Sequence, residues 1–134
     1  MIKDQRPLLY GKDFIYFINF IVMISWLEKR NFAAWIIVFL LAGLIFYVSS
    51  LSFTETHEQK NTGLQAIIYH IVIFFIFAFF LMVALVRGRK KEFFLSAIFG
   101  AVGYGILDEI HQYFVPSRFF SWSDVFLDSV GVIF

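Results

Sequence analysis

The sequence predicts an all-α integral membrane protein: a bundle of four transmembrane helices preceded by a short N-terminal interfacial helix. Three observations support this fold class. Of the 134 residues, 60% are hydrophobic and only 16% are charged, whereas a soluble domain carries about a quarter charged residues. Several uncharged stretches approach the roughly 20 residues that a helix needs to cross the hydrocarbon core. The chain has no cysteine, which excludes disulfides and thiolate metal ligands.

The first hydrophobic stretch, Phe14–Leu27, is too short to cross comfortably. It is flanked by Lys12 and Asp13 on one side and by charged residues 28–30 on the other. We therefore expect a helix that lies in the cytoplasmic interface. A second hypothesis places the true start at Met23, after which the chain resembles a short cationic tail before the first span. Residues 1–31 form the predicted N-terminal region, and residues 32–134 form the four-helix domain.

Three later stretches are long enough to span the membrane: Phe32–Phe53, Leu64–Val86 and Phe93–Phe114. The fourth, Phe119–Phe134, would reach about 24 Å at 1.5 Å per residue, short of the roughly 30 Å core. It either stops near the far interface or belongs to a longer parent chain. Pro116 breaks the helix between the third and fourth stretches, and the short connections predict antiparallel neighbours.

The distribution of lysine and arginine predicts the orientation, because these residues stay in cytoplasmic loops. The loops 28–31 and 87–92 together hold Lys29, Arg30, Arg87, Arg89, Lys90 and Lys91. The opposite side holds Lys60 and Arg118. The protein is therefore expected in the cytoplasmic membrane, with loop 87–92 on the cytoplasmic side. Residues 54–63 and 116–118 are expected on the extracytoplasmic side. The net charge of +1 gives no reason to expect a nucleic-acid partner.

The candidate site is the polar block 108–128, since ionisable residues within membrane segments are rare and usually functional. Asp108 shares a helix face with His111 and Gln112, and Tyr104 and small residues continue that stripe toward Gly100. A second stripe in the last helix contains Ser121, Asp124, Asp128 and Gly131. His70 lies about two turns into the second span. All of these groups are expected at a similar depth in the outer leaflet.

These residue types suggest recognition of a polar headgroup, with chemistry possible. Arg118, on a rigid Pro-Ser-Arg corner, suits a phosphate or carboxylate. The candidates for a general acid or base are Asp108, Glu109, His111 and Asp124. His70 and His111 could bind a metal with two carboxylates, but their spacing matches no closed zinc pattern. The prediction is therefore no metal and no cofactor.

Structural roles compete with the functional ones. Ser121 and Asp124 form a helix-start signature. A competing role for Arg118 is to neutralise Asp108 or Asp124 across the hairpin as a structural ion pair. Glu109 is expected on a different side from Asp108, facing water or headgroups.

Asp128 lies too far into the last helix to act as a cap, so it needs a partner. The candidates for that partner are His111, Arg118 and Tyr104.

The run Ile106–Arg118, followed by Ser121 and by Asp124-Val125, resembles the signature of VanZ-like membrane proteins. In that family an acidic-Glu-x-x-Gln helix end leads through a Pro-x-Arg turn to an aspartate at the start of the last span. Residues 47–50 and His70 also match its layout. The resemblance covers residues of about 35 to 134. The site residues that it implies are His70, Glu109, Gln112, Arg118 and Asp124, and we add Asp128 to this ligand-binding set.

The sequence thus predicts a cell-envelope protein that recognises a polar lipid or lipid-linked headgroup at the outer leaflet. The resemblance implies a link to glycopeptide (teicoplanin) resistance. The alternative is a non-catalytic membrane subunit whose polar cluster is structural and which docks a partner protein. Homo-oligomerisation and enzyme activity are both left open.

Overall fold

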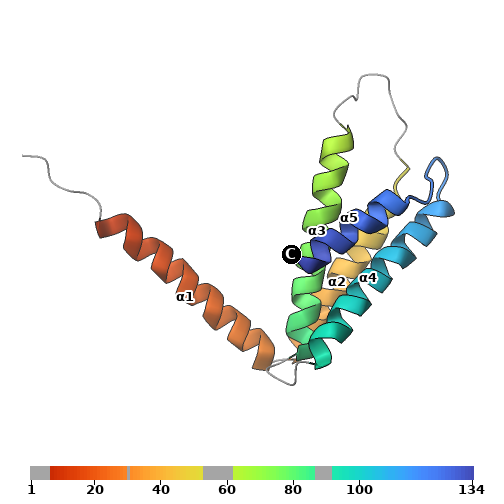
Figure 1. Ribbon diagram of the computed structural model, residues 1–134. Coiled ribbons are helices and arrows are strands. Elements are labelled where there is room, and N and C mark those ends of the chain that lie inside the picture. Colours follow the sequence, from red (N-terminus) through yellow and green to blue (C-terminus); the bar gives the residue numbers. More distant parts are fainter. Residues whose placement is uncertain (1–6, 30, 53–61, 87–91) are drawn as a thin grey trace, which may run out of the picture.

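The computed structural model describes residues 7–29, 31–52, 62–86 and 92–134, and within these ranges every regular element is a helix. The five helices are α1 (Pro7–Lys29), α2 (Asn31–Ser49), α3 (Thr62–Val86), α4 (Glu92–Tyr113) and α5 (Trp122–Ile133). Helices α2 to α5 form a bundle, and α1 leaves it at one end (Figure 1). The all-α prediction is confirmed.

Three helices are long and apolar enough to cross a membrane, over Phe32–Ser49, Gly63–Val86 and Glu92–Tyr113. They coincide with the three long stretches predicted from the sequence, and the chain is a membrane protein. The helix α2 ends at Ser49, four residues before the predicted boundary. The Ser49 and Ser50 hydroxyls both donate to the Phe46 carbonyl, at 3.3 and 2.7 Å, and such side-chain bonds compete with the helical backbone pattern.

The helix α5 begins at Trp122, three residues later than predicted, because Ser121 caps it. Ser121 has an extended backbone (φ −128°, ψ 113°), and its hydroxyl accepts a hydrogen bond from the Asp124 N–H at 3.3 Å. The predicted helix-start signature is therefore confirmed. With 12 residues, α5 is about 18 Å long. It slants across α3 and ends partway along the bundle (Figure 1).

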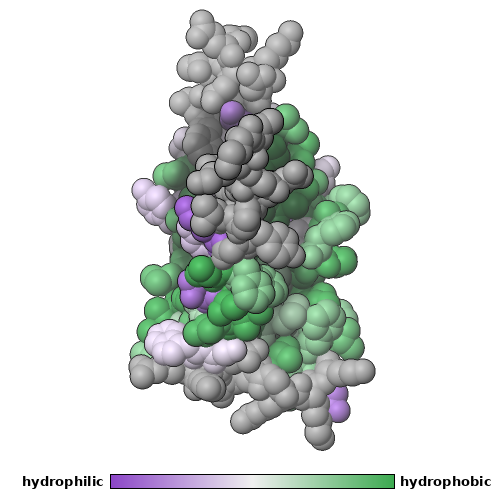
Figure 2. All heavy atoms as spheres, turned by 90° about the vertical axis from the view of Figure 1, so that its left-hand side faces the viewer, coloured by the Kyte–Doolittle hydropathy of each residue, from purple (hydrophilic) through white to green (hydrophobic). Residues whose placement is uncertain are grey.

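The helix α1 is longer than the predicted stretch Phe14–Leu27. It runs for 23 residues, because the pair Lys12-Asp13 lies inside the helix instead of ending it. Figure 1 shows α1 pointing away from the bundle, and the large apolar side chains along it, such as Phe17 at 60% exposure, are uncovered. Leu27, near its end, is buried. Where side chains are coloured, the face of the molecule from which α1 extends is largely apolar (Figure 2). The position of α1 in the membrane interface stays a prediction.

Small residues let α5 approach its neighbours closely. A Cβ added to Gly131 would collide with the backbone carbonyl of Ile71 in α3. A Cβ added to Gly105 in α4 would meet Asp128 Oδ2 at 3.1 Å, whereas Gly103 has open space around it. On α4, Gly105 therefore faces α5 at close range, whereas Gly103 does not.

The predicted orientation cannot be traced in the structure, because residues 53–61 and 87–91 lie outside the described ranges. The bundle nevertheless has two distinct ends. The end of α2, the beginning of α3, the end of α4 and the beginning of α5 all lie together at one of them (Figure 1).

Candidate functional site

A cluster of buried polar side chains lies toward this end of the bundle. Its members are contributed by α3, α4 and α5, and each is at most 6% exposed: His70, Asp108, Glu109, Gln112 and Asp128. We call these five residues the polar cluster. Polar groups buried without partners cost several kcal/mol, on the order of 2–7 each, so their hydrogen bonds define the site.

Asp128 is paired with His70. The His70 Nδ1 and the Asp128 Oδ1 are 2.8 Å apart. The prediction that Asp128 pairs with His111, Arg118 or Tyr104 was wrong. The close crossing of α5 over α3 at Gly131 and Ile71 explains the pairing. His70 directly precedes Ile71, and Asp128 lies about one turn before Gly131, so the crossing brings the two side chains together.

Glu109 is fully buried, with 0% exposure, and does not face water or headgroups as expected. Its Oε1 accepts a hydrogen bond from Gln112 Nε2, and its Oε2 accepts one from the backbone N–H of Ser121, both at 3.0 Å. The turn after α4 folds the chain back, so the segment that leads into α5 covers this carboxylate.

Gln112 links the carboxylates to Arg118. Its Nε2 donates to Asp108 Oδ2 at 2.9 Å as well as to Glu109. Its Oε1 accepts from Nε of Arg118 at 3.1 Å and from a terminal guanidinium nitrogen. Two nitrogens of the Arg118 guanidinium therefore donate to a single amide oxygen, and its predicted binding of a phosphate or carboxylate stays a prediction.

A tight turn positions Arg118. The Arg118 N–H donates to the Val115 carbonyl at 3.1 Å, and Ser117 has a φ of 66°. A positive φ at the third position after Pro116 at the second is the type II pattern. The Pro-Ser-Arg corner predicted from the sequence is therefore a defined turn.

Two predicted site residues lie at the edges of the cluster. His111 faces α2, where its Nε2 is 2.9 Å from the Ser50 hydroxyl and its ring stacks on Phe46 with centroids 4.1 Å apart. Asp124 is partly exposed in the first turn of α5. Tyr104 donates to the Ala42 carbonyl at 2.6 Å. Among the candidate acids and bases, Asp108 and Glu109 therefore belong to the buried cluster.

Three buried polar atoms lack a hydrogen-bond partner among the described residues: Tyr69 Oη, Asp108 Oδ1 and Asp128 Oδ2. Tyr69 directly precedes His70 of the polar cluster on α3. Tyr69 was not among the predicted site residues. Its spacing of four residues from Gln65 and from Ile73 nevertheless places all three on one face of α3.

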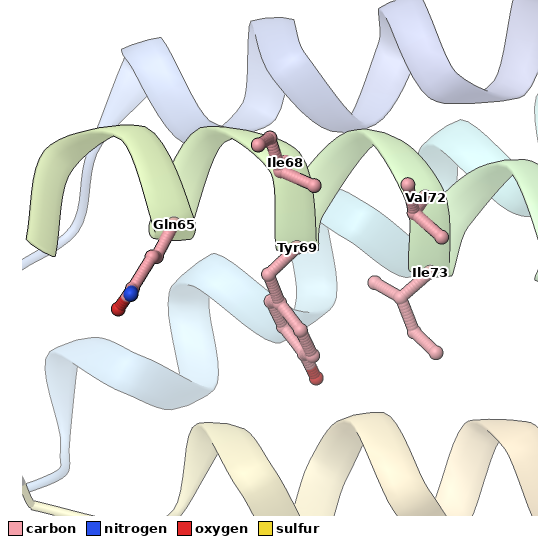
Figure 3. A pocket seen from close by; sticks show the side chains of 5 residues that line it. All are labelled: Gln65, Ile68, Tyr69, Val72 and Ile73. Carbon is pink, nitrogen blue, oxygen red and sulfur yellow. The ribbon is translucent and has the colours of Figure 1, made fainter.

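That face of α3 lines a groove of about 320 Å³. Its lining residues are Gln65, Ile68, Tyr69, Val72 and Ile73. The side chains of Gln65, Tyr69 and Ile73 project from α3 toward α2 (Figure 3). A second hollow of about 700 Å³ lies between the beginnings of α3 and α5 and includes Ala66, Trp122 and Asp124. The groove is apolar except at Gln65 and at the Tyr69 hydroxyl.

The sequence analysis weighed His70 and His111 with two carboxylates as metal ligands and predicted no metal. The structure instead brings His70 together with Glu109 and Asp128. One ligand atom from each lies within 4.8 Å of the other two. Sequence spacing did not reveal this group, because its members come from three different helices.

A family model described as VanZ/LLP1 matches residues 14–134. No curated protein and no solved structure matches the chain.

Proposed function

The chain belongs to the VanZ/LLP1 family, and from this premise we propose that it recognises a polar lipid or lipid-linked headgroup at the outer leaflet of the cytoplasmic membrane. The observation that carries the proposal is the Tyr69 hydroxyl. It is buried with no hydrogen-bond partner among the described residues, in the wall of an apolar groove next to the polar cluster. In such a groove, the apolar side chains would contact the lipid chain, and the hydroxyl and the polar cluster would contact the headgroup.

The apolar part of the groove suits an acyl or prenyl chain. Ile68, Val72 and Ile73 supply the lining, and they lie on a helix apolar enough to cross the membrane. Ile68 and Val72 are about half exposed, which leaves this part of the groove open to a lipid chain. A chain that enters the groove leaves other lipid chains and not water, so van der Waals packing against these side chains would hold it.

The polar part of the site suits a headgroup that carries hydrogen-bond donors. Asp108 Oδ1 and Tyr69 Oη are both able to accept hydrogen bonds, and neither has a partner in the part of the chain that the structure describes. Arg118 is linked to Asp108 by Gln112, which accepts a hydrogen bond from Arg118 and donates one to Asp108. A guanidinium group favours binding of phosphate. Ethanolamine or glycerol on a phosphate combines these features, whereas the trimethylammonium of choline has no N–H to donate.

The orientation is part of the proposal. The positive-inside distribution puts the beginning of α3 and the Arg118 turn outside the cytoplasm. The site would then meet lipids and lipid-linked precursors of the outer leaflet. In a bacterial host, the family association predicts a change in teicoplanin susceptibility, which a minimum inhibitory concentration with and without expression of the chain would measure.

Thermal unfolding of the detergent-purified chain in EDTA tests recognition. A ligand that binds the folded state raises the melting temperature with its concentration. We expect a rise with phosphatidylethanolamine or phosphatidylglycerol and none with phosphatidylcholine. The variant Ile73→Trp, which fills the groove, should abolish the rise. Phe75→Trp, at an exposed position of the same helix, is the matched control and should keep it. Equal shifts for all three lipids would contradict the proposal.

A second candidate is a structural clasp without a ligand. The observation that favours it is the His70–Asp128 bond at 2.8 Å, which ties α3 to α5 directly. In that case no lipid would shift the melting temperature, and Ile73→Trp would behave like Phe75→Trp.

A further inference from the structure

The three side chains His70, Glu109 and Asp128 have the arrangement of a cation site. One imidazole nitrogen and two carboxylate oxygens lie within 4.8 Å of one another, and all three residues are buried. Each comes from a different helix of the bundle, so the packing of the bundle fixes their separation.

An orphaned oxygen points independently to a ligand. Asp128 is 1% exposed, and its Oδ1 is used by His70, but its Oδ2 has no partner among the described residues. That oxygen lies against Gly105, one turn before Glu109 on α4. It therefore projects from α5 toward the helix that carries the second carboxylate. A buried polar atom of this kind calls for a bound group.

The charges of the cluster suit a divalent ion. Asp108, Glu109 and Asp128 carry up to three negative charges. Within the described ranges, the permanent cation bonded to this cluster is Arg118, through Gln112. A dipositive ion would balance the remaining two charges at a place where an unbalanced charge is expensive.

Glu109 is oriented by hydrogen bonds to both of its carboxylate oxygens, as ligating carboxylates in metal sites commonly are. Gln112 bonds its Oε1 and the Ser121 N–H bonds its Oε2, and each oxygen keeps a further lone pair. Such outer contacts orient ligating carboxylates and tune affinity. Imidazole favours zinc and other transition metals, and carboxylates also suit manganese.

We propose that His70, Glu109 and Asp128 form a binding site for one divalent transition-metal ion of the Zn²⁺ or Mn²⁺ class. The site is independent of the lipid groove, although it lies beside it. It joins α3, α4 and α5, so the bound ion would stabilise the packing of the bundle.

Metal retention tests the proposal. The full chain in detergent, without added lipid, is stripped with EDTA, incubated with Zn²⁺ or Mn²⁺ and desalted, and the metal is counted by mass spectrometry. We expect about one ion per chain and a melting temperature that rises with ion concentration. Glu109→Gln and Asp128→Asn should weaken binding at least about tenfold. Their matched controls, Glu92→Gln and Asp13→Asn at exposed positions, should bind as the wild type does.

A spectroscopic measurement on the wild type keeps the proposal testable if the variants do not fold. X-ray absorption of the loaded chain should show one imidazole nitrogen among oxygen ligands. A wild-type chain that retains no ion, or an ion with no imidazole in its shell, overturns the metal site. Because the lipid assay contains EDTA and the metal assay contains no added lipid, failure of one proposal is distinguishable from failure of the other.

Discussion

His70 and Asp128 are separated by 58 residues in the chain, yet their side chains meet at 2.8 Å in the interior of the bundle. The contact joins α3 to α5, and both side chains are almost completely buried. It accounts for the aspartate that no capping role could explain, and it depends on the close crossing of these two helices.

Removal of the Asp128 carboxylate should destabilise the fold. Asp128→Ala leaves the buried imidazole without its partner, and we expect the free energy of unfolding to fall by about 2 kcal/mol or more. A double-mutant cycle with His70→Ala should give a coupling energy of about 1–3 kcal/mol. Both are measured by reversible unfolding in detergent. Asp13→Ala on the exposed face of α1 is the control. A coupling energy near zero would contradict the pairing of His70 with Asp128.

Gly131 should tolerate no side chain. Gly131→Ala puts a methyl group against the Ile71 carbonyl, and forcing the helices apart should cost about 1–3 kcal/mol. Gly103→Ala adds the same methyl group where there is open space. It should be neutral or stabilise the chain by up to about 1 kcal/mol, because alanine is the better helix former. Melting temperatures compare the two variants, and equal effects would contradict the proposed close crossing.

The turn before α5 should favour glycine over a branched residue at position 117. Ser117 has a positive φ of 66°, which costs a side-chain-bearing residue roughly 1–2 kcal/mol. Ser117→Gly should therefore unfold at the same or a higher temperature than the wild type, and Ser117→Val at a lower one. A Val variant as stable as the Gly variant would show that the turn has another conformation.

The cap of α5 should contribute measurably to stability. Ser121→Ala removes the acceptor of the Asp124 N–H, and we expect a loss of about 1 kcal/mol. Ser123→Ala, two residues later and exposed, is the matched control and should change the free energy of unfolding by less than about 0.5 kcal/mol. Both are measured in the same denaturant series.

Hydropathy was sufficient to predict the three long helices, because an apolar stretch of membrane-spanning length has few alternatives. The start of α5 was misplaced, since Phe119 and Phe120 continue the apolar run although Ser121 caps the helix after them. The start of α1 was misplaced for the opposite reason. The charged pair Lys12-Asp13 ends an apolar run without ending a helix.

The sequence analysis named all five residues of the polar cluster, whereas their pairings and the buried Tyr69 hydroxyl were not predictable. Asp108 and Gln112 share a face by spacing alone and are indeed bonded. The partner of Asp128 depends on where α5 crosses α3, and the burial of Glu109 depends on a turn that brings Ser121 over it. Neither relationship has a periodicity that a sequence could display.

The hydrogen bonds of the polar cluster also bear on biosynthesis. Glu109 is bonded within the next twelve residues, by Gln112 and Ser121, and Asp128 is bonded by His70, which leaves the ribosome much earlier. Ribosome-arrested chains of increasing length, probed with a protease that cleaves at Arg118, should become protected once Ser121 has emerged. Asp128 thus pairs with a residue that is synthesised before it, and Glu109 pairs with residues that are synthesised shortly after it. Neither carboxylate depends on a distant downstream segment for its hydrogen bonds during insertion into the membrane.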